Sequence, residues 1–265
     1  MTDTILRFIH ISDTHISANP DYGRGSWQSP RSTREGAEAL VRQLNNLPFE
    51  PDFILHTGDV AYDPDPSAYD VARDILGKLR YPVYYVAGNH DYPSELQRIM
   101  LNREELLPSF YYTFEINGVQ FVCLDSNGPA EPPRGFVTEE QLTWLESICR
   151  ADDSRPLIVA IHHHILPVGI PWLDDFMRTT NGEEVHRALF PARDRLRGVF
   201  FGHIHQNVDM YRDGILYAST LSSWVQFHAW PGQTETIADI DADPGFSLVT
   251  LTRDQTYIRR CRFRD

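Results

Sequence analysis

Apolar residues in this chain fall into short runs, and each of these runs stops at a group of polar residues. Leu6–Ile11 is followed by Ser-Asp-Thr-His, and Phe53–His56 is followed by Thr-Gly-Asp. Val83–Val86, Leu157–Ile161 and Val199–Phe201 are further runs that end in the same way. Short apolar runs bounded by turn residues predict buried strands.

Helical spacing of apolar residues separates these strands. This spacing predicts one helix from Thr33 to about Leu44, with Thr33 as a possible N-cap. It predicts a second helix over about Ser67–Leu79. The resulting β-α-β-α-β order predicts a parallel sheet with right-handed crossovers. Further helices are expected over Ser94–Leu101, Thr138–Cys149 and Gly182–Phe190.

Hairpins are predicted in the middle and in the last quarter of the chain. Asn117-Gly118 joins the strand-like runs Tyr111–Ile116 and Val119–Leu124, and Asn-Gly is the strongest short-range hairpin signal. Four later strands are expected, with Asp213-Gly214 as a turn between the first two: Val208–Tyr211, Ile215–Ala218, Phe246–Thr252 and Tyr257–Phe263. We expect an α/β fold in one domain, residues 1–265: a four-layer αββα sandwich of two mixed sheets packed face to face, with helices outside.

Composition and charge narrow the range of partners. The chain is 42% hydrophobic and 23% charged, which is typical of a globular protein. A formal net charge of -13 argues against nucleic acid and anionic membranes as partners. No apolar run approaches about 20 residues and the amino terminus has no basic segment, so neither a membrane span nor a signal peptide is expected. Three cysteines without paired spacing favour a reducing, cytoplasmic location.

Metal-competent residues follow five of the predicted strands. Side chains at positions i and i+2 of an extended segment point the same way. The side chains of Asp13 and His15 are therefore expected to face one site, and so are those of His203 and His205. Sites of α/β folds form at the carboxyl ends of strands. Oxygen and nitrogen donors without thiolate suit Fe, Mn or Zn. The seven candidate ligands are enough for two ions that share a carboxylate: Asp13, His15, Asp59, Asn89, His162, His203 and His205.

The motifs D-x-H, G-D, G-N-H-D, H-H and G-H-x-H, in this order from Ile5 to His205, resemble the calcineurin-like metallophosphoesterases. The resemblance implies a dinuclear site at the carboxyl ends of strands. One ion would be held by Asp13, His15, Asp59 and His205. The other would be held by Asp59, Asn89, His162 and His203, with Asp59 bridging. His163 remains an alternative to His162.

His90 stands beside a ligand without being needed as one. It is a candidate to stabilise developing charge or to protonate the leaving group, with Asp91 orienting it. Asn89 and His90 are also the candidates for binding the substrate. Paired ions generate hydroxide near neutral pH and make the site electropositive despite the acidic chain. His10 and His56, inside strands, are interpreted as structural.

The chain is most similar to the bacterial branch that contains class III cyclic nucleotide phosphodiesterases and glycerophosphodiesterases. The D-T-H and G-N-H-D motifs and the stretch Ala218–Phe227 carry this resemblance. It implies a phosphodiesterase for small anionic diesters, with 3′,5′-cyclic nucleotides (cAMP, cGMP) as the leading hypothesis. A glycerophosphodiesterase, a broad-specificity phosphomonoesterase and a non-catalytic scaffold are the alternatives.

Aromatic residues in loops and late segments are candidates to stack on a base, although each of them equally suits a gap beside the sheet. These candidates are Trp27, Trp172, Trp224, Phe227, His228 and Trp230. Pairing of the late hairpins across a two-fold axis would give a homodimer.

Overall fold

The computed structural model describes residues 3–62 and 66–264, which form two mixed sheets. The first sheet has the strand order β11-β10-β1-β2-β3, and the second β4-β5-β6-β7-β9-β8. The strands of the first sheet are β1 (Thr4–Ile11), β2 (Phe53–His56), β3 (Val83–Tyr85), β10 (Gly245–Thr252) and β11 (Thr256–Arg262). Those of the second are β4 (Tyr112–Ile116), β5 (Val119–Cys123), β6 (Leu157–Ala160), β7 (Leu196–Phe201), β8 (Asp209–Arg212) and β9 (Ile215–Ser219).

The parallel pairing predicted from the β-α-β-α-β order is confirmed. β1, β2 and β3 are parallel neighbours, whereas β10 runs antiparallel to β1. In the second sheet β5, β6, β7 and β9 are parallel, and the two hairpins add antiparallel strands at its edges. The carboxyl ends of β1, β2, β3, β6 and β7 carry the polar residues predicted to form the site.

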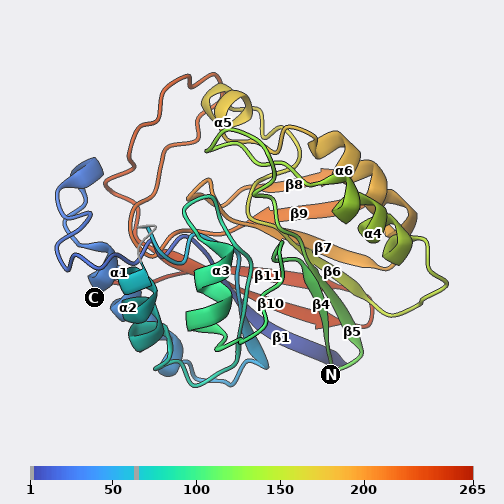
Figure 1. Cartoon of the computed structure of the whole chain (residues 1–265), viewed down its shortest axis with the longest axis horizontal. Coiled ribbons are helices and arrows are strands. Elements are labelled where there is room, and N and C mark those ends of the chain that lie inside the picture. Colours follow the sequence, from blue (N-terminus) through green and yellow to red (C-terminus); the bar gives the residue numbers. More distant parts are fainter. Residues whose placement is uncertain (1–2, 63–65, 265) are drawn as a thin grey trace.

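Helices cover the outer faces of the two sheets (Figure 1). The helices are α1 (Thr33–Asn45), α2 (Pro66–Leu76), α3 (Pro93–Glu95), α4 (Glu139–Cys149), α5 (Pro171–Phe176) and α6 (Gly182–Leu189). Apolar residues of α1 and α2 pack with the first sheet, and those of α4, α5 and α6 with the second. The four-layer αββα sandwich predicted from the sequence is therefore confirmed.

Aromatic side chains fill the space between the sheets. The ring of Phe8 in β1 stacks on Phe53 at 5.1 Å and meets Phe121 and Phe200 of the opposite sheet edge-on at 6.0 and 5.3 Å. All four are at most 1% exposed. Because this core links the two sheets, it fixes the relative positions of their strands.

Two helix predictions need correction. Helix α1 is capped by Ser32 rather than Thr33: the Ser32 hydroxyl accepts from the Glu35 N–H, and the Glu35 carboxylate accepts from the Ser32 N–H. The predicted helix Ser94–Leu101 is instead one α-turn followed by a π-helix, Leu96–Met100, in which the Leu101 N–H donates to the Leu96 carbonyl. Periodicity alone does not distinguish such a widened turn from α-helix.

Removing the cap should cost measurable stability. Ser32→Ala is expected to lower the free energy of unfolding by about 1 kcal/mol, because the Glu35 N–H in the first turn loses its acceptor. Urea denaturation measures this change. Ser147→Ala, which removes an exposed hydroxyl from α4, should change it by less than about 0.5 kcal/mol. Equal losses in both variants would contradict the capping assignment.

No helix among residues 3–62 and 66–264 is long and apolar enough to cross a bilayer.

Candidate metal centre

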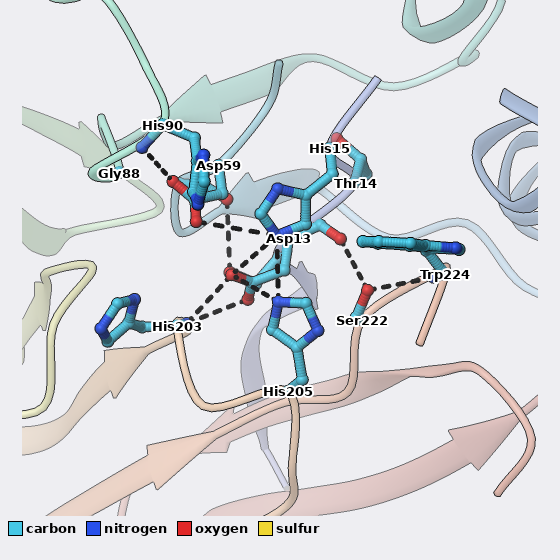
Figure 2. Close-up of polar contacts among 12 residues, drawn as sticks. Asp13, Thr14, His15, Asp59, Gly88, His90, His203, His205, Ser222 and Trp224 are labelled. Carbon is cyan, nitrogen blue, oxygen red and sulfur yellow. Dashed lines mark hydrogen bonds and ion pairs between the residues drawn. The ribbon is translucent and has the colours of Figure 1, made fainter. Parts of the chain in front are cut away.

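The strand-end loops converge on two aspartates (Figure 2). The loop after β1 is joined to the loop after β2 by hydrogen bonds from the Asp13 and His15 N–H groups to the Gly58 and Asp59 carbonyls, each 2.9 Å long. The His203 N–H after β7 donates to the Asp13 carboxylate at 3.0 Å. These backbone contacts bring residues that are up to 190 positions apart in sequence to one point.

The paired ligands converge through left-handed turns. Asp13, His15, His203 and His205 have φ angles of 55°, 47°, 68° and 47°. The expectation that each pair converges because its backbone is extended is therefore wrong, although each pair does meet. Non-glycine residues in this region cost roughly 1–3 kcal/mol each and collect at functional sites.

The first group of donors surrounds the Nε2 atom of His205. This nitrogen lies 3.0 Å from the His15 Nε2 and 3.5 Å from the Asp13 carboxylate, and the His15 Nε2 lies 3.7 Å from Asp59. The other ring nitrogen of His205 lies 2.8 Å from the Val225 carbonyl, which can only accept. The proton of a neutral His205 is therefore on Nδ1, and the Nε2 lone pair faces the site.

The second group surrounds the Nε2 atom of His162. It lies 3.1 Å from both the Asn89 Oδ1 and the His203 Nδ1, and 3.3 Å from the Asp59 carboxylate. The Nδ1 of His162 lies 2.7 Å from the Thr57 carbonyl, which again directs Nε2 to the site. All seven residues singled out as ligands in the sequence are thus brought together, in two groups that share Asp59.

His163 has different surroundings. Its Nδ1 lies 2.7 Å from the Ser126 hydroxyl, and its Nε2 is buried without a hydrogen-bond partner. His163 also lies near His162 and His203 in one potential metal-binding group. Because His162 rather than His163 contacts Asn89 and Asp59, the geometry favours His162 as the donor from this strand end.

Two glycines permit the close approach of the loops. A Cβ on Gly88 would overlap the Asp59 carboxylate, and a Cβ on Gly202 would overlap the Ser12 hydroxyl. Both glycines directly precede proposed ligands. Any side chain at either position would therefore push the loops apart.

The charges and burial of these donor residues suit the binding of cations. Asp13 and Asp59 are 0% and 2% exposed, and within the described residues every ion-pair partner recorded for them is a histidine. Burying two carboxylates without a guanidinium or ammonium group is costly unless cations compensate for them. Metal-competent atoms within 4.8 Å of one another form several overlapping groups here, as two adjacent metal ions require.

The protonation states agree with this fit. Burial lowers the pKa of His15 to about 3, which leaves a neutral imidazole with a free lone pair at neutral pH. Burial opposes charge on His162 as well, but the Asp59 and Asp13 carboxylates and the Thr57 carbonyl together outweigh it and raise the pKa of His162 to about 9. A cation that binds beside Asp59 would take the place of this proton.

Comparison with known proteins identifies the family. The model of the calcineurin-like phosphoesterase family matches residues 6–207. The chain belongs to this family. It is therefore a metallophosphoesterase, and its paired Asp and His groups lie where the family's dinuclear metal site is expected.

Relatives and structures agree with this assignment. A 3′,5′-cyclic-nucleotide phosphodiesterase of Nostoc sp. is 30% identical, with 95% of this chain and 90% of the relative covered. The 3′,5′-cyclic adenosine monophosphate phosphodiesterase CpdA of Vibrio vulnificus is 27% identical, with 95% and 87% covered. The glycerophosphodiester phosphodiesterase GpdQ of Enterobacter lignolyticus is 30% identical, with 78% and 74% covered. A dimetal phosphatase from Danio rerio has the same fold, with a TM-score of 0.69 at 16% identity over 98% of this chain and 97% of that one.

His90 of this metallophosphoesterase is placed by its backbone and by an aromatic neighbour. Its N–H donates to the Asp59 carboxylate at 2.9 Å, and its ring stacks on Tyr62 at 4.6 Å with an interplanar angle of 24°. Asp91 does not orient this ring, contrary to the prediction. The Asp91 carboxylate accepts from the N–H groups of Val60, Ala61 and Gly88 and from the Tyr69 hydroxyl, so it ties the G-N-H-D loop to the loop after β2.

Two residues of the centre were missed in the sequence. Tyr62 supports His90, and the Ser222 hydroxyl donates to the Asp13 carbonyl at 2.7 Å while accepting from the Trp224 N–H at 3.0 Å (Figure 2). Tyr62 follows the G-D motif by three positions, which is a usable signal. Ser222 has no local signal, because its role depends on a contact with a residue 209 positions away.

The stacking contact should affect turnover modestly. Tyr62→Leu is expected to lower kcat by roughly 2- to 10-fold, since an aromatic pair contributes about 0.5–1.5 kcal/mol. Tyr62→Phe keeps the ring and should retain most of the activity. Steady-state kinetics on one diester would show the difference. If the Phe variant lost as much as the Leu variant, the hydroxyl rather than the stacked ring would be the important group.

A cavity of about 440 Å³ opens above the metal centre. Four of the aromatic candidates line it, namely Trp27, Trp172, Trp224 and Phe227, whereas His228 and Trp230 are not among its described lining residues. Those lining residues include no lysine or arginine. The walls are therefore largely aromatic, and the charge that attracts an anion must come from bound cations.

Proposed function

We propose that this metallophosphoesterase is a phosphodiesterase that cleaves small phosphodiesters, with 3′,5′-cyclic nucleotides as the expected substrates. One observation carries the proposal: seven oxygen and nitrogen donors meet in two groups, and five of them line an aromatic cavity whose described lining has no lysine or arginine. The names of the Nostoc and Vibrio relatives support cyclic nucleotides in particular.

The expected cofactors are two divalent or mixed-valence ions, of Fe, Mn or Zn. The proposed ligands of one ion are Asp13, His15, Asp59 and His205, and those of the other are Asp59, Asn89, His162 and His203. Two divalent ions would outweigh the charges of the two aspartates and leave the centre electropositive. When bound, they would supply Lewis acidity and lower the pKa of a water nucleophile.

The chain's own residues then bind the diester and move a proton. Asn89 and His90 are half-buried at the cavity, where an amide N–H and an imidazole N–H can donate to phosphoryl oxygens. We assign the His90 imidazole to stabilising charge on the leaving oxygen and to protonating it. Asp91 contributes by holding the loop that carries Asn89 and His90 in position.

The lining of the cavity, apart from the proposed metal ions, suits a diester better than a monoester. A phosphomonoester carries about -1.5 to -2 charges at pH 7, whereas a diester carries one. Without lysine or arginine in the described lining, the extra charge of a monoester has no side-chain partner. Glycerophosphodiesters are the second candidate, because the Enterobacter relative is named for them. The complete donor set argues against a non-catalytic scaffold.

A substrate panel with added manganese tests the proposal. It compares 3′,5′-cyclic AMP, a 2′,3′-cyclic nucleotide, bis-p-nitrophenyl phosphate, glycerophosphocholine and p-nitrophenyl phosphate. We expect the highest kcat/KM on 3′,5′-cyclic AMP and the lowest on the monoester, with an Asp13→Asn variant as the control for contaminating enzymes. Faster cleavage of the monoester than of every diester would contradict the proposal, and inactivity on all five would support a scaffold.

A further inference from the structure

Three aromatic side chains form one wall of the cavity, and they come from segments far apart in sequence. Phe227 lies against the ring of His205, with centroids 5.1 Å apart. Trp27 and Trp172 each meet Phe227 edge-on, at 5.2 and 6.0 Å. We call these three residues the aromatic wall. Its innermost contact is with His205, a proposed metal ligand.

Trp27 is the exposed member of this wall. Its side chain is 47% exposed, whereas Phe227 and Trp172 are 8% and 3% exposed. The backbone of Trp27 is left-handed, with φ 52° and ψ 28°, and so is that of Gln28, with φ 59°. Two successive non-glycine residues in this region are unfavourable, and the half-exposed indole gains little burial in return. Such strain points to a functional position.

The loop that carries Trp27 is anchored by other aromatic residues that line the cavity. The ring of Tyr22 lies 4.4 Å from that of Tyr62, and Gly23 packs so closely on the Trp224 indole that a Cβ would lie 2.7 Å from it. These contacts fix one end of the loop beside the metal centre. Trp27, farther along the same loop, lines the same cavity.

We propose that the aromatic wall is the subsite for a flat aromatic group of the diester, the nucleobase of a cyclic nucleotide, and that Trp27 determines the preference for such substrates. The inference rests on the proposed phosphodiesterase function. Aromatic faces suit a base because each base has an apolar π-surface. The described lining offers no lysine or arginine that would recognise a more highly charged group instead.

Kinetics on two diesters test this specificity. One is 3′,5′-cyclic AMP, and the other is glycerophosphoglycerol, which has no ring. Trp27→Ala is expected to lower the ratio of kcat/KM for cyclic AMP over glycerophosphoglycerol by roughly 5- to 100-fold, mainly through a higher KM for cyclic AMP. Trp27→Phe should keep most of the ratio. Tyr211→Ala, which removes a 76% exposed aromatic side chain from β8, should leave it unchanged. An unchanged ratio in Trp27→Ala would overturn the proposal.

A binding measurement separates the subsite from the reaction. In calorimetric titrations of the manganese-loaded protein, AMP should bind more tightly than ribose 5-phosphate, and Trp27→Ala should remove most of this difference. Equal affinities in the unaltered protein would overturn the subsite, whatever the enzyme cleaves. A clear preference for AMP in a protein that cleaves no cyclic nucleotide would retain the subsite and reject only the proposed function.

Discussion

His90→Ala is expected to lower kcat by roughly 10²–10⁴-fold, the range for loss of a general acid–base group, while both metal ions stay bound. The contact that His90 makes with Asp59 uses its backbone N–H, which the Ala variant retains. Asp59 should therefore keep its position, and the seven proposed ligands remain. The variant removes only the imidazole that faces the cavity beside Tyr62.

Turnover and metal content must be measured on the same preparation. His228→Ala is the matched control, because His228 is a partly exposed histidine outside the described lining of the cavity. It should keep both its activity and its metal. Unchanged turnover in His90→Ala would remove His90 from the mechanism. Loss of one ion would instead make His90 a ligand, an arrangement that its proximity to His15 and Asp59 allows.

Asp59→Asn is expected to weaken the binding of both ions together and to lower activity by at least roughly 10²-fold. The Asp59 carboxylate lies 3.7 Å from the His15 Nε2 in one donor group and 3.3 Å from the His162 Nε2 in the other. Asparagine has nearly the same shape but no charge, so it removes the anion that the two groups share. Metal analysis after dialysis would report the stoichiometry.

Asp174→Asn is the control for this substitution. The Asp174 carboxylate accepts from the N–H groups of Val168, Gly169 and Ile170, outside the donor groups, so this variant should retain both ions. If Asp59→Asn kept one ion at full occupancy, Asp59 would belong to a single metal and the bridging assignment would be wrong.

Strand positions and the convergence of the strand ends could be predicted because both follow from local patterns. Apolar runs such as Leu6–Ile11 and Phe53–His56 became buried strands, and parallel pairing placed their carboxyl ends side by side. A ligand at a strand end needs no long-range information once the sheet is known. This is why the sequence could single out seven candidate ligands that the structure brings together.

The supporting contacts could not be predicted because they depend on backbone turns and distant partners. An alternating pattern does not reveal that Asp13 and His15 reach the site through left-handed residues. Asp91 was expected to serve its neighbour His90, but three buried backbone N–H groups and the Tyr69 hydroxyl take up its oxygens. Backbone N–H groups that need a side-chain acceptor can be identified only when the loops are placed in space.

Interpreting individual polar residues inside strands was easier. His10 and His56 were interpreted as structural, and each is fully buried with its Nε2 within 3.1 Å of a threonine hydroxyl, of Thr57 and Thr14 respectively. The role of Trp27 was less clear in the sequence, because its position at the cavity depends on how the loop before α1 packs on Trp224.

The most direct measurement is an anomalous difference map from a crystal grown with manganese. Two peaks should flank the Asp59 carboxylate, one contacted by Asp13, His15 and His205, and the other by Asn89, His162 and His203. A single peak, or no peak at Asp59, would contradict the paired metal centre on which the proposed phosphodiesterase activity depends.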